Sequence, residues 1–303
     1  MTSLQEEILD LKKNKNAVIL AHTYQPGEVQ DIADFVGDSY GLSVEASQTN
    51  ADMIIFCGVR FMAETAAILN PEKEVILPDS SAGCPMADMI TPEDLQELKN
   101  QYPSYLVMCY VNSTAEIKAL SDVCCTSSNA LKIANKLPAE KGIIFVPDKH
   151  LGSFVQQRSG RKMIMWDGFC PTHLRITPQM VKNAREAHPE ATILIHPEAP
   201  NECRILADEI LSTGGMCDFV KKSEMQEFII ATENGLIHTL QKENSDKKFY
   251  PLSDEIVCPN MKKGSLEKVK RALDGSGGER IIIEPQISKK AERSLRKMLE
   301  LSR

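Results

Sequence analysis

Three cysteines, each followed by proline, divide this sequence at nearly equal intervals. They are Cys84, Cys170 and Cys258, and the intervals between them are 86 and 88 residues. Seven residues after each of them comes a Thr or Ser next to Pro or Gly, which is a helix-start signal. One Cys-Pro pair says little about function. Three such pairs in equivalent places predict three repeats that contribute to one shared site.

Cysteine thiolates bind zinc or iron–sulfur clusters. Structural zinc usually takes four ligands from closely spaced Cys-x-x-Cys pairs, and the sequence contains no such pair. Three equivalent cysteines favour one [4Fe–4S] cluster per chain, with three Cys ligands and one open iron that acts as a Lewis acid. The alternative is three buried structural cysteines. We expect burial without metal binding for the other cysteines, Cys57, Cys109, Cys124, Cys125, Cys203 and Cys217.

Ring-bearing polar residues end three predicted strands, and a second polar residue follows each of them two positions later. The spacing is again 88 and 86 residues, and the pairs are His22 with Tyr24, Tyr110 with Asn112, and His196 with Glu198. Imidazole, phenol and carboxyl groups move protons when their pKa values are tuned. We therefore interpret His22, Tyr24, His196 and Glu198 as candidate catalytic residues, and Tyr110 and Asn112 as donors to carboxylates. The alternative is an ordinary polar loop in each repeat.

Small hydroxyl residues recur where helices should begin. Ser39, Ser127 and Thr213 keep the intervals of 88 and 86 residues. The exposed N–H groups and the dipole of a helix N-terminus favour carboxylate or phosphate groups. We expect these residues to contact an anionic ligand, while plain helix capping remains the simpler alternative.

Short apolar segments alternate with helical patterns along the whole chain. Equivalent strands are predicted at 17–21, 105–109 and 192–195. This alternation predicts an α/β protein with three homologous αβα sandwich domains, whose parallel sheets are arranged around a pseudo-threefold axis. We expect the domains at 1–83, 84–169 and 170–262, with the C-terminal tail 263–303 packing back on the first. Ligands bind beyond the carboxyl ends of parallel strands, so the three repeats can share a central cavity.

Composition narrows the class of protein. The formal net charge of −7 argues against a nucleic-acid partner. The apolar segments are far shorter than the roughly 18 residues of a membrane span, so we expect no membrane partner. The first residues form an amphipathic pattern that does not resemble a signal peptide. Nine cysteines without a disulfide-framework pattern indicate reduced thiols, and we expect a cytoplasmic location.

At this point the sequence resembles the quinolinate synthase family over essentially its whole length. The matching stretches are 21–25, 31–39, 61–64, 84–87, 110–114, 196–198, 212–216 and 260–263. Two positions depart from the family pattern. Thr23 stands where Asn or His is common, and Ala199 stands where Cys is common, so position 199 is not expected to be a ligand.

The resemblance implies that iminoaspartate and dihydroxyacetone phosphate condense to quinolinate, with loss of phosphate and water, for NAD biosynthesis. It implies three domains about a [4Fe–4S] cluster held by Cys84, Cys170 and Cys258, and proton transfer by Tyr24 and Glu198. It also implies a functional link to an aspartate-oxidising enzyme that supplies iminoaspartate. The residues that match substrate contacts are His22, Ser39, Tyr110, Asn112, Ser127, His196, Glu198 and Thr213.

Two other functions stay open from the sequence. One is a different [4Fe–4S]-dependent hydro-lyase that acts on a small hydroxy acid. The other is a non-catalytic sensor built on the cluster, which would need no proton-transfer residues.

Overall fold

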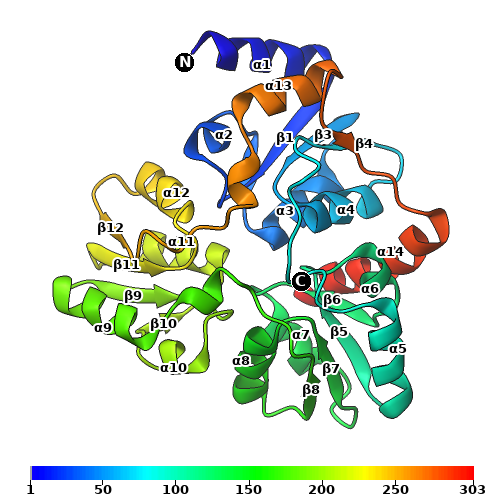
Figure 1. Cartoon of the computed structure of the whole chain (residues 1–303), viewed down its shortest axis with the longest axis vertical. Coiled ribbons are helices and arrows are strands. Elements are labelled where there is room, and N and C mark those ends of the chain that lie inside the picture. The colour runs from blue at the N-terminus through cyan, green and yellow to red at the C-terminus, as the bar shows by residue number, and fades with distance from the viewer. Residues whose placement is uncertain (1) are drawn as a thin grey trace.

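Three separate β-sheets with flanking helices lie around a common centre in the computed structural model, which describes residues 2–303 (Figure 1). Two of the sheets are wholly parallel, and the first has one additional antiparallel strand. The predicted fold class is therefore confirmed, with three αβα sandwich domains. No helix among these residues is long and apolar enough to cross a membrane.

The first domain contains a sheet with the strand order β13-β4-β3-β1-β2. Its strands are β1 (Ala17–His22), β2 (Phe35–Gly37), β3 (Met53–Cys57), β4 (Glu74–Leu77) and β13 (Glu279–Arg280). Its helices are α1 (Ser3–Asn14), α2 (Gly27–Asp31), α3 (Ser39–Gln48) and α4 (Arg60–Leu69). The central strands β1 and β3 are mostly buried, as expected for a sheet that is covered on both faces.

The second domain has the strand order β6-β5-β7-β8. Its strands are β5 (Leu106–Tyr110), β6 (Val123–Cys125), β7 (Ile143–Val146) and β8 (Met163–Met165). Its helices are α5 (Pro92–Gln101), α6 (Ala115–Ala119), α7 (Ala130–Lys136) and α8 (Lys149–Ser159).

The third domain repeats this arrangement with the order β10-β9-β11-β12. Its strands are β9 (Thr192–Ile195), β10 (Glu209–Ile210), β11 (Glu227–Ala231) and β12 (Lys248–Pro251). Its α-helices are α9 (Pro178–Ala187), α10 (Asn201–Arg204), α11 (Thr213–Lys222) and α12 (Leu236–Glu243). Two short 3-10 helices follow the last two Cys-Pro pairs, namely η1 (His173–Arg175) and η2 (Met261–Lys263).

One carboxylate contact occurs in every domain and explains why the strand ends are equivalent. An aspartate that precedes the second strand accepts a hydrogen bond from a backbone N–H inside the first strand, at 2.7–2.8 Å. The pairs are Asp34 with Ile19, Asp122 with Val107, and Asp208 with Ile193. Each contact fixes the crossover segment against its strand, so β1, β5 and β9 deliver their last residues to matching places.

The helix starts that follow the three cysteines form as predicted. Thr91, Thr177 and Ser265 are N-caps, and each side-chain oxygen accepts the N–H three residues later. They begin α5, α9 and α13 (Leu266–Asp274), the first two of which have proline at the first helical position. Every Cys-Pro loop is thus anchored by a capped helix on its C-terminal side.

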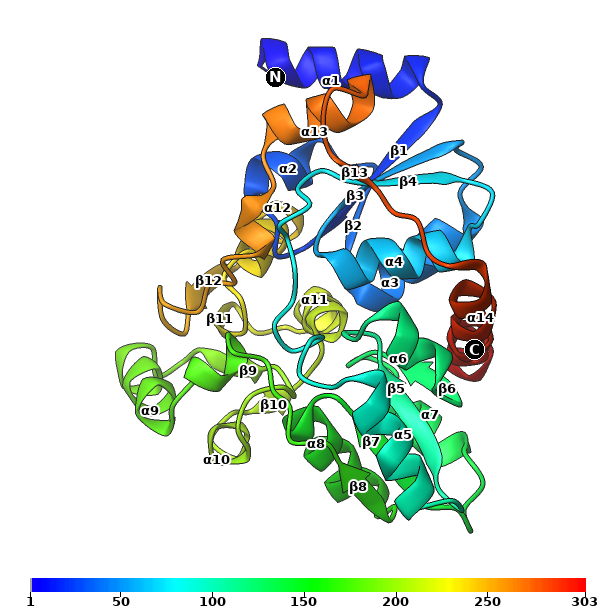
Figure 2. The same cartoon turned by 45° about the vertical axis from the view of Figure 1, so that its right-hand side comes forward.

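The C-terminal segment packs on two domains. Helix α13 lies against α1, and β13 pairs with β4, so this part of the tail lies on the first domain. Helix α14 (Pro285–Ser302) instead packs mainly against α6 and β6 of the second domain and also touches α4 (Figure 2). Its buried face contains Ala291, Leu295 and Met298, and Ser294 Oγ donates to Lys118 O at 2.8 Å. That apolar stripe is buried between two domains, which tail-to-first-domain packing alone would not achieve.

Candidate active site

A cavity of about 280 Å³ lies where the three domains meet. Its wall contains every side chain that the sequence analysis selected for chemistry. The first domain provides His22, Tyr24 and Ser39, the second Tyr110, Asn112 and Ser127, and the third His196, Glu198 and Thr213, together with Cys84, Cys170 and Cys258. The equal spacing in the sequence therefore corresponds to convergence in space. The residues lie at or just beyond the carboxyl ends of the parallel strands, as the fold requires.

The three cysteines form one part of this wall as free, half-buried thiols. Burial raises the pKa of the Cys84 thiol to about 12, and the charge of Cys258 adds to the effect. Burial also raises the pKa of Cys170 well above its usual range, and the charge of Glu198 contributes. Thiolates at these positions need a positive partner, and a thiolate-binding metal group provides one. None of the other six cysteines lines this cavity.

A second set of donors could also reach one metal ion. The ligand atoms of Cys170, His173 and Glu198 all lie within 4.8 Å of one another. His173 and Glu198 are already paired, however, because His173 Nδ1 lies 2.7 Å from Glu198 Oε2. The same His173 Nδ1 also lies 3.2 Å from Cys170 Sγ. The three equivalent cysteines line one cavity and are the donors that we consider further.

His22 and His196 adopt the same local turn in the first and third domains. The backbone N–H of Tyr24 donates to His22 Nδ1 at 3.1 Å, and that of Glu198 donates to His196 Nδ1 at 3.3 Å. A nitrogen that accepts a hydrogen bond carries no proton, so the proton of each neutral ring lies on Nε2. Burial lowers the pKa of both histidines to about 3. Both rings are therefore neutral N–H donors near neutral pH.

Glu198 is a buried carboxylate surrounded by donors. Burial alone would raise its pKa, but His173 and His196, with hydrogen bonds from His173 and Tyr110, lower the pKa to about 2. The hydroxyl of Tyr110 donates to Oε1, and His173 occupies Oε2. Glu198 is consequently ionised near neutral pH and held in one orientation at the cavity wall.

A chain of hydrogen bonds joins Glu198 to Tyr24. The hydroxyl of Tyr24 lies 2.6 Å from Thr232 Oγ1, and Thr232 Oγ1 lies 2.8 Å from His173 Nε2. His173 Nδ1 then reaches Glu198. Burial raises the pKa of Tyr24 well above its usual range, although hydrogen bonds from Thr213 and Thr232 oppose the shift. One end of the chain thus holds a proton and the other end is a carboxylate.

The sequence analysis missed His173 and Thr232. His173 follows Cys170 by three residues and Thr232 follows β11 directly, and neither position has an equivalent residue type in the other repeats. The available signal was position: both come just after elements that the repeat already assigned to the site.

The hydroxyl residues occupy helix starts on the cavity wall. Ser39 and Thr213 are the first residues of α3 and α11, and the capping side chains are those of Asp38 and Ser212. Ser127 lies in the turn before α7. Capping therefore does not use the hydroxyls of Ser39 and Thr213. Asn112 adds a buried Oδ1 that has no partner within residues 2–303.

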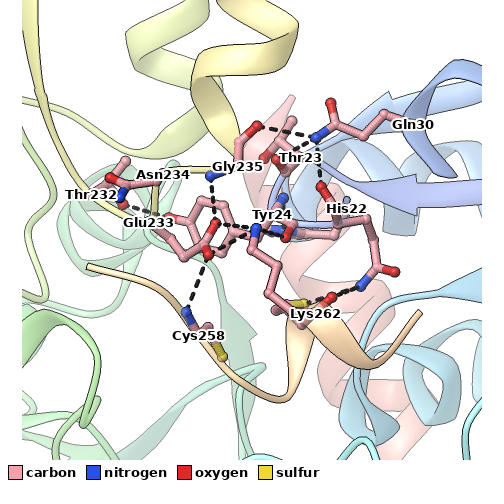
Figure 3. A network of polar contacts seen from close by, with 12 residues as sticks. His22, Thr23, Tyr24, Gln30, Thr232, Glu233, Asn234, Gly235, Cys258 and Lys262 are labelled. Carbon is pink, nitrogen blue, oxygen red and sulfur yellow. Dashed lines mark hydrogen bonds and ion pairs between the residues drawn. The ribbon is translucent and has the colours of Figure 1, made fainter. Parts of the chain in front are cut away.

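Lys262 lies beside the cavity, but its ammonium group is occupied. Lys262 Nζ donates to Tyr24 O at 2.6 Å and pairs with Glu233 Oε1 at 2.9 Å (Figure 3). Lys263 Nζ donates to Ser81 O at 2.6 Å, and Lys263 does not line the cavity. Within the described part of the chain, Arg175 is the one arginine or lysine in the cavity wall.

Comparison with known proteins identifies a family over the whole length of the chain. The family model described as quinolinate synthetase A protein matches residues 6–300. A quinolinate synthase from Caldicellulosiruptor saccharolyticus is 53% identical over 99% of this chain and 98% of that protein. Quinolinate synthases from Dehalococcoides mccartyi strain CBDB1 and Methanoregula boonei are 47% and 49% identical, each over 98% of both chains. The match runs through all three domains and all three cysteines that converge on the cavity, and the chain belongs to the quinolinate synthase family.

Proposed function

We propose that this protein is a quinolinate synthase of NAD biosynthesis. It condenses iminoaspartate with dihydroxyacetone phosphate, releasing phosphate and water, and forms quinolinate. The observation that carries the proposal is the convergence of three equivalent cysteines and a Tyr24–Glu198 hydrogen-bond chain on one cavity. A transferase of this condensing type needs both a group that helps water to leave and groups that move protons at carbon.

Cys84, Cys170 and Cys258 would hold one [4Fe–4S] cluster per chain. The fit rests on the donor set. Three soft sulfur ligands on one wall suit a group that binds thiolates, and burial raises the thiol pKa of Cys84 and Cys170. With three protein ligands, such a cluster keeps one open iron and supplies Lewis-acid chemistry for loss of water.

Substrate binding is assigned to neutral donors and helix starts. Both substrates are anions, whereas the chain is acidic overall, so local donors have to hold them. The Nε2–H groups of His22 and His196 and the hydroxyls at the starts of α3 and α11 can provide these contacts without a charged lysine. The full proposed set is His22, Ser39, Tyr110, Asn112, Ser127, His196, Glu198 and Thr213.

Proton transfer is assigned to the two ends of the hydrogen-bond chain. The ionised Glu198 Oε atoms accept a proton from substrate carbon or nitrogen, with His196 as their neighbour on the same turn. The hydroxyl of Tyr24 keeps its proton at neutral pH and can donate it, with His22 stacked edge-on against its ring at 4.5 Å between centroids. His173 and Thr232 orient both groups.

The chemistry of the substrate and of the cysteine ligands also indicates which enzyme supplies the substrate and in which compartment the protein acts. Iminoaspartate hydrolyses readily because it is an imine, so we expect a functional link to an enzyme that oxidises aspartate. Cysteine ligands have to stay reduced, and we therefore place the protein in the cytoplasm.

The test is an anaerobic assay of the purified chain with both substrates, together with counts of iron and sulfide. Quinolinate formation by protein that carries a [4Fe–4S] cluster supports the proposal. A cluster with dehydration of a hydroxy acid but no quinolinate would instead identify another hydro-lyase. A cluster with neither reaction would identify a sensor.

A further inference from the structure

Glu233 is a buried carboxylate that the proposed reaction does not use. It lies two residues past the end of β11, and its exposed fraction is 0%. Its Oε1 accepts the backbone N–H of Cys258 at 3.1 Å, and its Oε2 accepts the N–H of Gly235 at 2.7 Å (Figure 3). A buried charge is costly unless it is paired and hydrogen-bonded. Both oxygens of this carboxylate accept a backbone hydrogen bond, so the side chain is held in one position.

Lys262 is the cation that pairs with Glu233. Its Nζ lies 2.9 Å from Oε1 and 3.1 Å from Oε2 of Glu233. The same Nζ donates to the backbone oxygen of Tyr24 at 2.6 Å. Lys262 belongs to η2, directly after the Cys258 loop, and Gln25 Nε2 holds that helix through Met261 O at 2.7 Å.

These contacts connect three segments that are far apart in the sequence. The loop after β1 carries Tyr24, the loop after β11 carries Glu233, and the loop before η2 carries Cys258. Each of the last two meets the first through the ammonium group of Lys262. The loop that holds Cys258 has no regular secondary structure of its own. Its backbone is held by the Glu233 contact to the Cys258 N–H and by the Lys262 N–H, which donates to Cys258 O at 3.3 Å.

We infer that Glu233 and Lys262 are positioning residues that fix the position of Cys258 relative to Tyr24. The inference rests on the proposed function, because it concerns a proposed cluster ligand and a proposed proton donor. It predicts that loss of the Lys262–Glu233 pair both weakens cluster binding and slows substrate turnover. The two effects are measured separately.

The experiment compares the parent chain with Lys262→Met, Lys262→Arg and Glu233→Gln, all purified anaerobically. The first readout is the rate at which a ferrous-iron chelator removes iron from the cluster. The second is KM and kcat for quinolinate formation at matched cluster content. We expect Lys262→Met to release iron about tenfold faster or more, as befits loss of a charge-assisted hydrogen bond. Lys262→Arg keeps the charge and should stay within about threefold of the parent.

The effects of the two substitutions on the rate of iron release should not be additive. Glu233→Gln alone leaves Lys262 without its carboxylate, and Lys262→Met alone leaves Glu233 without its cation. The double variant should therefore release iron no faster than the worse single variant, which a double-mutant cycle measures directly.

Lys12→Met is the matched control. Lys12 pairs with Asp34 at 2.6 Å, and the other oxygen of Asp34 accepts a backbone N–H, so this pair also joins an ammonium group to a hydrogen-bonded carboxylate, at a site where the carboxylate is 37% exposed. Neither Lys12 nor Asp34 lines the cavity. We expect this variant to lower the melting temperature while iron release and KM stay at parent values.

The outcomes separate this inference from the proposed function. A parent chain that has no cluster or forms no quinolinate would overturn the proposed function itself. A parent with both, whose Lys262→Met and Glu233→Gln variants release iron at the parent rate, would overturn only the positioning role. Equal acceleration in Lys12→Met would also overturn it, since general destabilisation would then explain the effect.

Discussion

His173 Nδ1 lies 2.7 Å from Glu198 Oε2, and both side chains are 3% exposed. His173 has no counterpart in the other repeats, whereas Glu198 occupies a place that all three repeats share. The contact therefore joins a residue that occurs only in the third domain to a position that all three domains share. It makes Glu198 one end of a series of hydrogen bonds that runs through His173 and Thr232 to the hydroxyl of Tyr24.

The first prediction concerns Glu198→Gln. Glutamine keeps the shape and can still accept from Tyr110, but it cannot act as a base. General acid–base catalysis contributes about 10²–10⁴-fold, so turnover should fall at least about 100-fold. The measurement is anaerobic turnover with cluster content matched to the parent. Turnover near the parent value would show that Glu198 is a binding or structural group, and would move the proton transfer to Tyr24 and His22.

The second prediction concerns the thiols. Cys84→Ser, Cys170→Ser and Cys258→Ser should each lose the visible absorption of the cluster, because a serine oxygen is a poor replacement for a thiolate ligand. Cys57→Ser and Cys203→Ser are the controls, since both cysteines are buried away from the cavity. A cluster retained at full iron content in any of the first three variants would remove that residue from the ligand set.

The third prediction concerns anion binding at the helix starts. Ser127→Ala or Thr213→Ala should weaken substrate binding while leaving cluster content unchanged. A hydrogen bond to a charged group contributes roughly 1.5–3 kcal/mol, which corresponds to about tenfold to a hundredfold in affinity. Ser127 gives the cleaner test, because Thr213 Oγ1 also lies 3.1 Å from the Tyr24 hydroxyl. Unchanged apparent affinity in both variants would mean that these hydroxyls do not face the substrate.

The fourth prediction is a pH dependence of stability. Burial lowers the pKa of His22 and His196 from 6.5 to about 3. Between these pH values the unfolded chain binds protons at both histidines and the folded chain does not, so stability is lost as pH falls through this range. Each histidine contributes up to about 1.4 kcal/mol per pH unit. Denaturant unfolding at several pH values should show a shallower slope for His22→Asn than for the parent, and an identical slope would contradict the assignment of His22 as a buried neutral ring.

Much of the fold and of the cavity wall could be predicted from the sequence because the repeat multiplies each weak signal by three. Asp34, Asp122 and Asp208 recur at fixed intervals, and each makes the same contact with a strand. A residue that recurs in this way occupies a matching place in each domain, so the sequence spacing alone predicted which chemical groups lie together.

The remainder depends on tertiary contacts that have no repeat. His173, Thr232 and Glu233 act through partners more than 20 residues away, and their neighbours in the sequence contain no sign of those partners. The position of α14 is similar. Its apolar stripe was visible in the sequence, but which domain covers a stripe depends on the shape of the surfaces that the finished domains offer.

Residues from nearly the whole length of the chain form the cavity wall, so the cavity is completed late in translation. Its residues run from His22 to Met261, so every earlier fragment that leaves the ribosome has an incomplete pocket. A nascent chain that ends before Cys258 presents two of the three thiols and lacks the Lys262 contact to Tyr24. The three cysteines proposed as cluster ligands are therefore present together only after almost the whole chain has been translated, and a product that ends before Cys258 lacks one ligand of the proposed set.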